Sequence, residues 1–168
     1  MTTQPPVGTP RAGIPPVLAP AVPASPAPDA HAASRSAAYS RSPDQVFDVV
    51  TTYADLARWR SDVESVSMLA SDRFIEVRDS GDVEFRVTET KRPIEVVAET
   101  NGPGDRGGSW TFEISVEGSG SRLTITERGT CHDFIDRVKA HYSGGHAPPL
   151  DRYLIDLGRH FGEDVSPR

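Results

Sequence analysis

Two glutamates stand where an alternating strand pattern would place apolar side chains. Glu127 continues the face of Leu123 and Ile125, and Glu89 continues the face that Val83 begins. A carboxylate inside or at the mouth of a cavity can act as a general base or hold a ligand. At the rim of a sheet it is hydrated or paired with an arginine, which avoids burying an unpaired charge. We favour the rim for both glutamates, assign no catalytic residue, and keep Glu127 only as a candidate.

Three aromatic side chains have both a chemical and a structural interpretation. Trp59 and Trp110 could stack on a ring of a ligand, but tryptophans of small domains more often belong to the core, where we place both. Tyr153 could donate a hydrogen bond to a ligand oxygen, or it could lie at the edge of the core. Both interpretations of Tyr153 stay open.

Other kinds of chemistry lack the spacing that they require. The metal-binding side-chain types near the C-terminal end form no closed ligand set, so we expect neither a metal site nor a cofactor: Cys131, His132, Asp133, Asp136, His141 and His146. The single cysteine excludes a disulfide within the chain. The glycine-rich segment 102–108 lacks the Lys-Ser/Thr pair of a phosphate-binding loop and leads into a strand rather than a helix.

The element that would position Glu127 is a hairpin over Gly107–Gly129. Its first strand places four apolar side chains on one face: Trp110, Phe112, Ile114 and Val116. The turn at 118–120, with two glycines, supplies the positive φ angles that a hairpin needs. Four earlier strands, over 63–68, 73–79, 82–90 and 94–100, are joined by turns and indicate an antiparallel meander. A strand over 33–40 has only a weak pattern.

Helices are expected before and after the strands. The sequence Ser42-Pro43-Asp44-Gln45 is typical of a helix start with a capping box, and Asp55 can cap a second short helix over 56–59. A helical stripe runs over 134–142. The last helix carries an apolar face formed by Leu150, Tyr153, Leu154, Leu157 and Phe161. Polar residues lie opposite that face: Asp151, Arg152, Asp156 and Arg159.

The first 31 residues differ in composition from the rest of the chain. Nine of the fifteen prolines lie between Pro5 and Pro28, interleaved with Ala, Thr and Ser. Such a segment cannot bury enough apolar surface to offset its ordering entropy, so we expect a disordered or polyproline-like tail over 1–31. Prolines interrupt its apolar stretch, which excludes a membrane-spanning anchor there. One domain follows over 32–164, with a short tail over 165–168.

The charge of the chain limits its partners. A net charge of −6 at pH 7 argues against nonspecific binding to nucleic acid or to an anionic membrane, since both require an excess of Lys and Arg. The single cysteine fits the reducing cytoplasm, where we expect the protein. The oligomeric state stays open.

These elements predict an α+β fold. A curved antiparallel sheet of six to seven strands has one apolar face, and the long C-terminal helix can cover it, with two short helices after the first strand. The order of elements, together with the stretches over 40–66, 108–129 and 150–163, resembles the polyketide cyclase/dehydrase and START-related (SRPBCC) superfamily of helix-grip proteins. The resemblance implies a cavity between sheet and C-terminal helix that often holds an apolar or amphipathic small molecule. It supplies no common catalytic set.

The first functional hypothesis is therefore the binding or transport of a small apolar or amphipathic molecule. The residues expected around it are Phe85, Val87, Trp110, Phe112, Ile114, Leu123, Ile125, Glu127, Tyr153, Leu154 and Leu157. A second hypothesis is an enzyme of the cyclase or dehydratase kind that uses Glu127, with Tyr153 as a further acid–base group. A third is a regulatory domain whose proline-rich tail or exposed helix contacts another protein.

Overall fold

The computed structural model describes residues 31–102, 106–129 and 149–168. Strand β1 (His31–Tyr39) precedes helix α1 (Pro43–Thr51), the 3-10 turn η1 (Tyr53–Asp55) and the short helix α2 (Leu56–Trp59). The meander that follows consists of β2 (Ser65–Ala70), β3 (Arg73–Val77), β4 (Val83–Lys91), β5 (Glu95–Gly102), β6 (Arg106–Glu117) and β7 (Gly120–Gly129). Helix α4 (Pro149–Phe161) is the last element.

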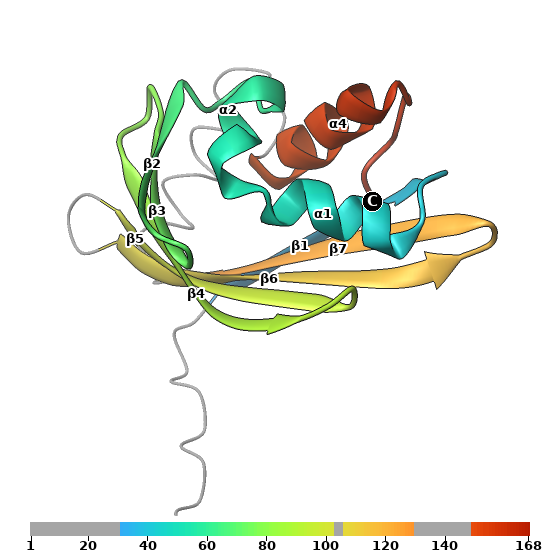
Figure 1. The fold of residues 1–168 in the computed structure, drawn as a ribbon, viewed down its shortest axis with the longest axis horizontal. Coiled ribbons are helices and arrows are strands. Elements are labelled where there is room, and N and C mark those ends of the chain that lie inside the picture. Colours follow the sequence, from blue (N-terminus) through green and yellow to red (C-terminus); the bar gives the residue numbers. More distant parts are fainter. Residues whose placement is uncertain (1–30, 103–105, 130–148) are drawn as a thin grey trace, which may run out of the picture.

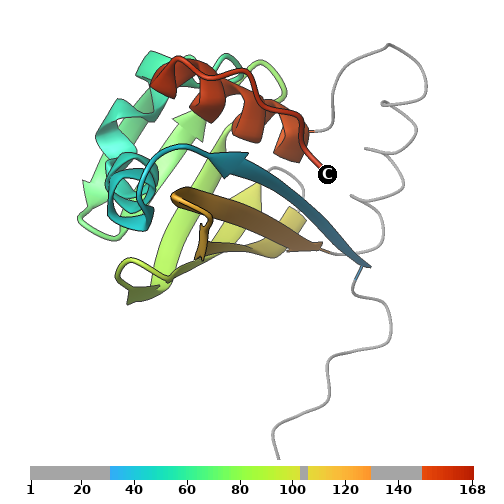
Figure 2. The same ribbon diagram turned by 90° about the vertical axis from the view of Figure 1, so that its right-hand side faces the viewer.

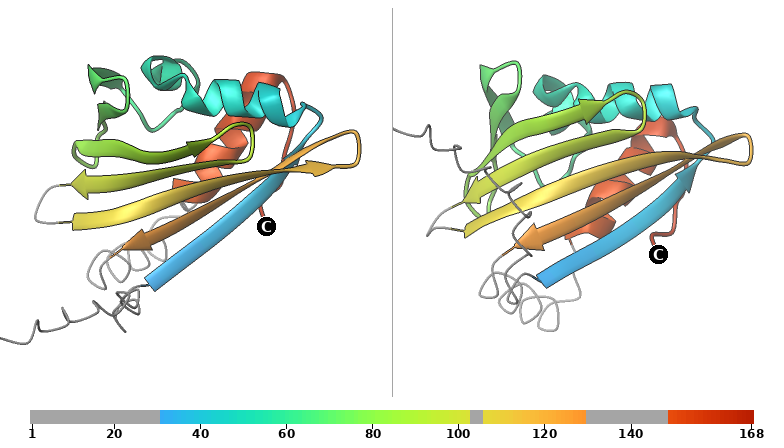
Figure 3. Two further views of the ribbon diagram at one scale, coloured as in Figure 1. Left: turned by 60° about the horizontal axis from the view of Figure 1, so that its bottom comes forward. Right: turned by 90° about the horizontal axis from the view of Figure 1, so that it is seen from below.

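The strands form one antiparallel sheet of seven strands, in the order β1-β7-β6-β5-β4-β3-β2. Helices α1, α2 and α4 lie on one side of this curved sheet (Figure 1), and the view turned by 90° shows the same arrangement (Figure 2). From below, the strands lie in front of the helices (Figure 3). The predicted α+β helix-grip fold is confirmed, including the weakly predicted first strand, which pairs with β7 along its whole length.

The helix start at residue 42 has the predicted capping box. The Oγ atom of Ser42 accepts a hydrogen bond from the backbone N–H of Gln45, and the Gln45 side chain accepts one from the backbone N–H of Ser42. The predicted cap of the second helix is wrong. Asp55 makes no side-chain capping bond and instead forms an ion pair with Arg58, one turn later, with an N–O distance of 3.1 Å. That turn begins from a preceding 3-10 turn, so Asp55 already has helical φ and ψ angles.

The hairpin of β6 and β7 has the register that the alternation predicts. Phe112 lies opposite Ile125, and Ile114 lies opposite Leu123, all four facing the helices. The turn residue Gly118 has a φ of 58°. Val116, predicted on the same face, is 74% exposed, because the tip of the hairpin extends past the helices (Figure 1).

Helix α4 buries the apolar face that its sequence predicts. Leu150, Tyr153, Leu154 and Leu157 are buried against the sheet and α2. The predicted position of Asp156 on the solvent side is wrong, since this residue is 2% exposed. Beyond the helix, the backbone of Arg168 exchanges two hydrogen bonds with Ser36 of β1, so the predicted C-terminal tail lies along the edge of β1.

Several predicted segments lie outside the described residues. These are the N-terminal tail except for residue 31, the helical stripe over 134–142, and the six side chains considered for a metal site. Within the described ranges, no group of three or more His, Cys, Asp or Glu side chains could hold a metal ion. No helix of these ranges is long and apolar enough to cross a membrane.

Candidate functional site

A cavity of about 20 Å³ lies between the sheet and the helices. That volume corresponds to the position of about one water molecule. Strands β3 to β6 contribute eight of its lining residues, and α1, η1, α2, the residue after α2 and α4 contribute one each. The residues that line it are Val50, Tyr53, Leu56, Arg60, Phe74, Glu76, Phe85, Val87, Val96, Ala98, Trp110, Phe112 and Tyr153.

Six of the thirteen lining residues are aromatic, and their rings are in mutual contact. Phe74 and Phe85 lie directly opposite each other on β3 and β4, and their rings stack with centroids 5.2 Å apart. Tyr53 stacks on the other side of Phe74 at 4.6 Å, while Trp110 meets Phe85 edge-on at 5.8 Å. Such pairs add packing energy beyond area burial and fix ring orientation. The wall is therefore rigid along the strands and apolar over most of its area.

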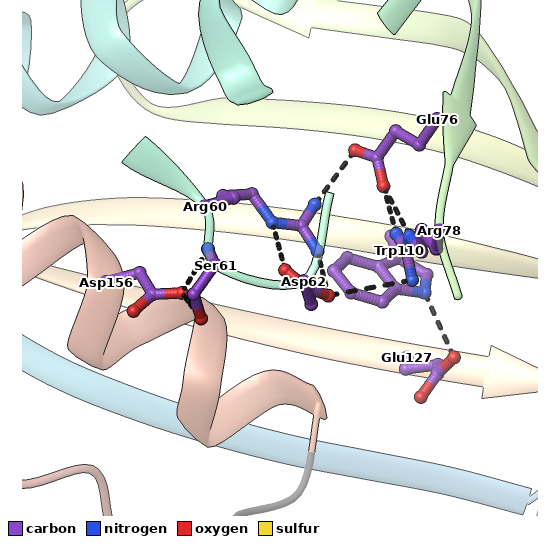
Figure 4. A network of polar contacts seen from close by, with 8 residues as sticks. All are labelled: Arg60, Ser61, Asp62, Glu76, Arg78, Trp110, Glu127 and Asp156. Atoms are coloured by element: carbon purple, nitrogen blue, oxygen red, sulfur yellow. Dashed lines mark hydrogen bonds and ion pairs between the residues drawn. The ribbon is translucent and has the colours of Figure 1, made fainter. Parts of the chain in front are cut away.

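One side of the cavity is charged. Arg60 directly follows α2, and its side chain is 1% exposed. Its Nη1 donates to Oε1 of Glu76 on β3 at 2.8 Å, and its Nε and Nη2 donate to the two oxygens of Asp62 at 3.1 and 2.7 Å. Figure 4 shows the guanidinium group between these two carboxylates. Burial alone would lower the pKa of Arg60, but Glu76 and Asp62 outweigh that effect and raise it, so the guanidinium stays charged.

A second arginine completes this group. Arg78 donates through Nε to Oε2 of Glu76 at 2.8 Å, and its Nη2 contacts the same oxygen. Its Nη1 lies 4.0 Å from Oδ2 of Asp62. We call Arg60, Asp62, Glu76 and Arg78 the ion cluster. Its two cations and two anions balance, so a buried charge is nowhere left uncompensated.

Helix α4 contacts the ion cluster at Arg60 and also binds Ser61, the residue between Arg60 and Asp62. The guanidinium of Arg60 lies over the ring of Tyr153, 4.7 Å from its centroid. Asp156 accepts hydrogen bonds from the backbone N–H and the Oγ of Ser61, at 2.8 and 2.7 Å (Figure 4). Burial raises the pKa of the Tyr153 phenol, so its hydroxyl stays protonated at neutral pH.

The eleven residues predicted around a ligand separate into two groups. Five of them line the cavity: Phe85, Val87, Trp110, Phe112 and Tyr153. Five others are buried in the core on either side and do not line this cavity: Ile114, Leu123, Ile125, Leu154 and Leu157. The space thus meets α4 at Tyr153, in the N-terminal half of the helix. Ligand contact by any of these residues stays a prediction.

Glu127, the eleventh residue, is half-buried and lies directly opposite Trp110 in the hairpin. Its Oε1 accepts a hydrogen bond from Nε1 of Trp110 at 3.1 Å (Figure 4). It is not among the residues that line the cavity. Glu89 is exposed and forms an ion pair with Lys91 at 2.6 Å. A β-bulge between Val87 and Glu89 turns its side chain away from the apolar face that the alternation assigned to it.

The tryptophans differ in burial. Trp110 is 3% exposed, as predicted for a core residue, and it also lines the cavity. Trp59 is only half-buried; its ring meets Tyr153 edge-on with centroids 5.2 Å apart. Trp59 therefore packs behind the cavity wall and does not contribute to it.

Sequence reasoning missed the ion cluster. Glu76 had a usable signal, because it follows Phe74 by two residues and so shares its face of β3, and Arg78 lies two residues later, just past the end of the strand. This is the kind of interruption that drew attention to Glu127. Arg60 had no such signal, since it lies in a short connection without periodicity.

Comparison with known proteins decides the family. The family described as polyketide cyclase / dehydrase and lipid transport matches residues 30–147. The chain belongs to this family. The match confirms the predicted resemblance to the SRPBCC superfamily, while no curated protein sequence matches the chain.

Solved structures agree with this assignment at the level of the fold. A START superfamily protein from Mycobacterium smegmatis has a TM-score of 0.64 and 11% identity, covering 77% of this chain and 96% of that one. A conserved protein from Geobacillus kaustophilus has a TM-score of 0.60 and 12% identity, covering 81% and 99%. An HSP90 activator from Plasmodium falciparum has a TM-score of 0.56 and 15% identity, covering 82% and 99%. Identities this low show the fold alone.

Proposed function

We propose that this protein binds a small apolar or amphipathic molecule in the cavity between its sheet and α4. The observation that supports the proposal is the composition of the cavity wall. Aromatic and aliphatic side chains from four strands and three helices converge there with only four polar ones, Tyr53, Arg60, Glu76 and Tyr153. A few polar groups on an otherwise apolar concave wall are typical of small-molecule sites. The family description, which includes lipid transport, agrees with such a ligand.

Binding requires the cavity to expand. At about 20 Å³ it holds the equivalent of one water molecule, whereas a benzene-sized ligand needs a cavity of roughly 150 Å³. The strands are held to each other by ladders of backbone hydrogen bonds. The helices are joined to the sheet mainly by side-chain contacts, so they form the wall that moves outward. Such a step makes association slower than diffusion to a preformed site.

The experiment is a titration of isotope-labelled protein with toluene, followed by amide chemical shifts. We expect saturable shifts at the amides of β4, β5 and β6 that flank the cavity. Ala98→Val adds two methyl groups directly to the cavity wall and should weaken binding several-fold. Ala70→Val makes the same change at an exposed position of β2 and serves as the matched control.

Two results would refute the proposal. One is the absence of saturable shifts up to the solubility limit of toluene. The other is an equal loss of affinity in Ala98→Val and Ala70→Val, because binding would then take place away from the cavity. Circular dichroism of both variants verifies that each is folded.

A further inference from the structure

Arg60 carries more hydrogen-bond donors than its neighbours accept. A guanidinium group has five N–H groups. Three of them have acceptors, on Asp62 and Glu76, and within the described part of the chain one N–H on each terminal nitrogen has none. The side chain is 1% exposed, so bulk water does not accept hydrogen bonds from these two N–H groups. A buried charged group whose N–H donors lack acceptors costs free energy. Because Arg60 lines the cavity, a molecule bound there could supply the missing acceptor.

The charge balance of the ion cluster limits which acceptors can bind the two remaining N–H groups of Arg60. Arg60 and Arg78 are already compensated by Asp62 and Glu76. A ligand carboxylate bound to Nη1 of Arg60 would lie next to Oε1 of Glu76, which is 2.8 Å from the same nitrogen. Two carboxylates that close together repel each other in a buried site. An uncharged oxygen avoids this repulsion and still accepts hydrogen bonds from the guanidinium of Arg60.

The remainder of the wall determines the rest of the ligand. Apart from Arg60, Glu76 and the two phenols of Tyr53 and Tyr153, every side chain that lines the cavity is an aliphatic or aromatic one. Polar groups at the other end of a ligand would therefore be buried without partners. The body of the ligand must be apolar, and a wall that includes six aromatic side chains favours a ring.

We infer that the cavity accepts an uncharged molecule with an apolar ring and one carbonyl or hydroxyl oxygen, and that this oxygen binds Arg60. The inference rests on the proposed function and specifies its ligand class. Arg60 is then the residue that determines specificity. It selects an acceptor oxygen over a hydrocarbon group and an uncharged group over a carboxylate.

Three probes of nearly equal shape test this inference by isothermal titration calorimetry on the unmodified chain. Acetophenone has a carbonyl oxygen, α-methylstyrene replaces that oxygen by a methylene group, and benzoate carries a negative charge. We expect acetophenone to bind about 10-fold more tightly than either of the others, the ratio typical of one hydrogen bond from a charged donor. No variant is needed for this comparison, so it does not depend on whether a substituted protein folds.

Charge variants test the second part. Asp62→Asn leaves the side chains of the cavity wall unchanged and gives the ion cluster an excess of one positive charge. We expect benzoate to bind about 10-fold more tightly to it, and acetophenone to change less than about 3-fold. Glu99→Gln alters the net charge equally at a half-exposed ion pair with Arg86 outside the cavity, and neither probe should respond.

The outcomes separate the two proposals. Equal affinities for acetophenone and α-methylstyrene would overturn the role of Arg60 and leave the proposed function intact. If benzoate were the tightest ligand of the unmodified chain, the role of Arg60 would also be overturned, because the site would then prefer an anion to an uncharged molecule. If none of the three probes, nor toluene, binds, both proposals fail.

Discussion

Replacing Arg60 and Glu76 one at a time and then together tests whether the ion cluster is a dry, coupled unit. Arg60→Met removes the donor to Oε1 of Glu76 but leaves Arg78 on Oε2. Glu76→Leu removes the acceptor but leaves Asp62 on Arg60. Both replacements approximate the volume of the original side chain, so cavities contribute little to the result.

The size of the effect follows from burial. Removing one partner of a buried ion pair destabilises a protein by about 3–5 kcal/mol, because the other charge is left uncompensated. In each single variant the remaining residue of the pair, Glu76 or Arg60, keeps one further ion pair. We therefore expect a loss at the lower end of this range, about 3 kcal/mol for each single variant. The double variant leaves Arg78 and Asp62, still one cation and one anion. We expect it to lie within about 1–2 kcal/mol of the unmodified chain.

The assay is equilibrium unfolding in urea, with the midpoint shift at constant slope as the measure of stability. For a chain of this length, about 3 kcal/mol corresponds to a fall of roughly 10 °C in Tm, which thermal unfolding detects independently. Ala70→Val serves again as the control for a change at an exposed site.

Two results would refute this reasoning. If the double variant loses about 6 kcal/mol, the effects of Arg60 and Glu76 are additive and the two are not coupled. If each single variant loses less than about 1 kcal/mol, water reaches the cluster, as at a surface ion pair. If instead the double variant folds stably, it provides a protein without Arg60, in which acetophenone and α-methylstyrene should bind equally.

Three further predictions concern the remainder of the fold. Gly120→Ala should lower stability by about 1–3 kcal/mol in urea unfolding, because its Cβ would collide with the carbonyl oxygen of Tyr39. Gly107→Ala should change it little, because among the described residues beyond its chain neighbours the nearest atom to such a Cβ is 3.8 Å away. Glu127→Gln keeps an acceptor for Nε1 of Trp110 and should leave probe binding unchanged, whereas Glu127→Leu should cost about 1 kcal/mol of stability. Burial raises the pKa of the phenols of Tyr39, Tyr53 and Tyr153 above the ordinary 10.0. The unfolded chain therefore loses these protons first, and the stability of the fold declines as the pH rises past that value. Tyrosinate absorbance of these three residues should then appear only together with unfolding.

The alternation of side chains predicted the hairpin well, because every residue of β6 from Gly108 to Glu117 pairs with one residue of β7 and no bulge interrupts the register. Phe112 and Ile125 were placed on one face by sequence alone, and they are opposite each other in the sheet. The same rule failed at Glu89, where a β-bulge adds one residue and reverses the face. A bulge has no signature in the alternation itself, so the pattern alone could not place this side chain; the rim position that we favoured for Glu89 agrees with its exposure and its ion pair with Lys91.

Polar residues of the site were beyond the reach of periodicity for a different reason. Asp156 has the position of a solvent-facing residue on α4, and what buries it is Ser61, which lies 95 residues earlier in the sequence. Arg60 is likewise buried by carboxylates that approach from another strand and from the next loop. A charge can be buried wherever the fold supplies a partner, and that partner is not visible in the local sequence.

Glu76 and Glu127 show why the site is built around Arg60. Both glutamates interrupt an apolar face of a strand, so the sequence treats them alike. Glu127 accepts from the neutral indole of its cross-strand neighbour and is not among the residues that line the cavity. Glu76 accepts from two guanidinium groups and does line it, together with Arg60. A group can select or transform a ligand only where it touches it, so we expect substitution of Arg60, rather than of Glu127, to change which molecules bind in this cavity.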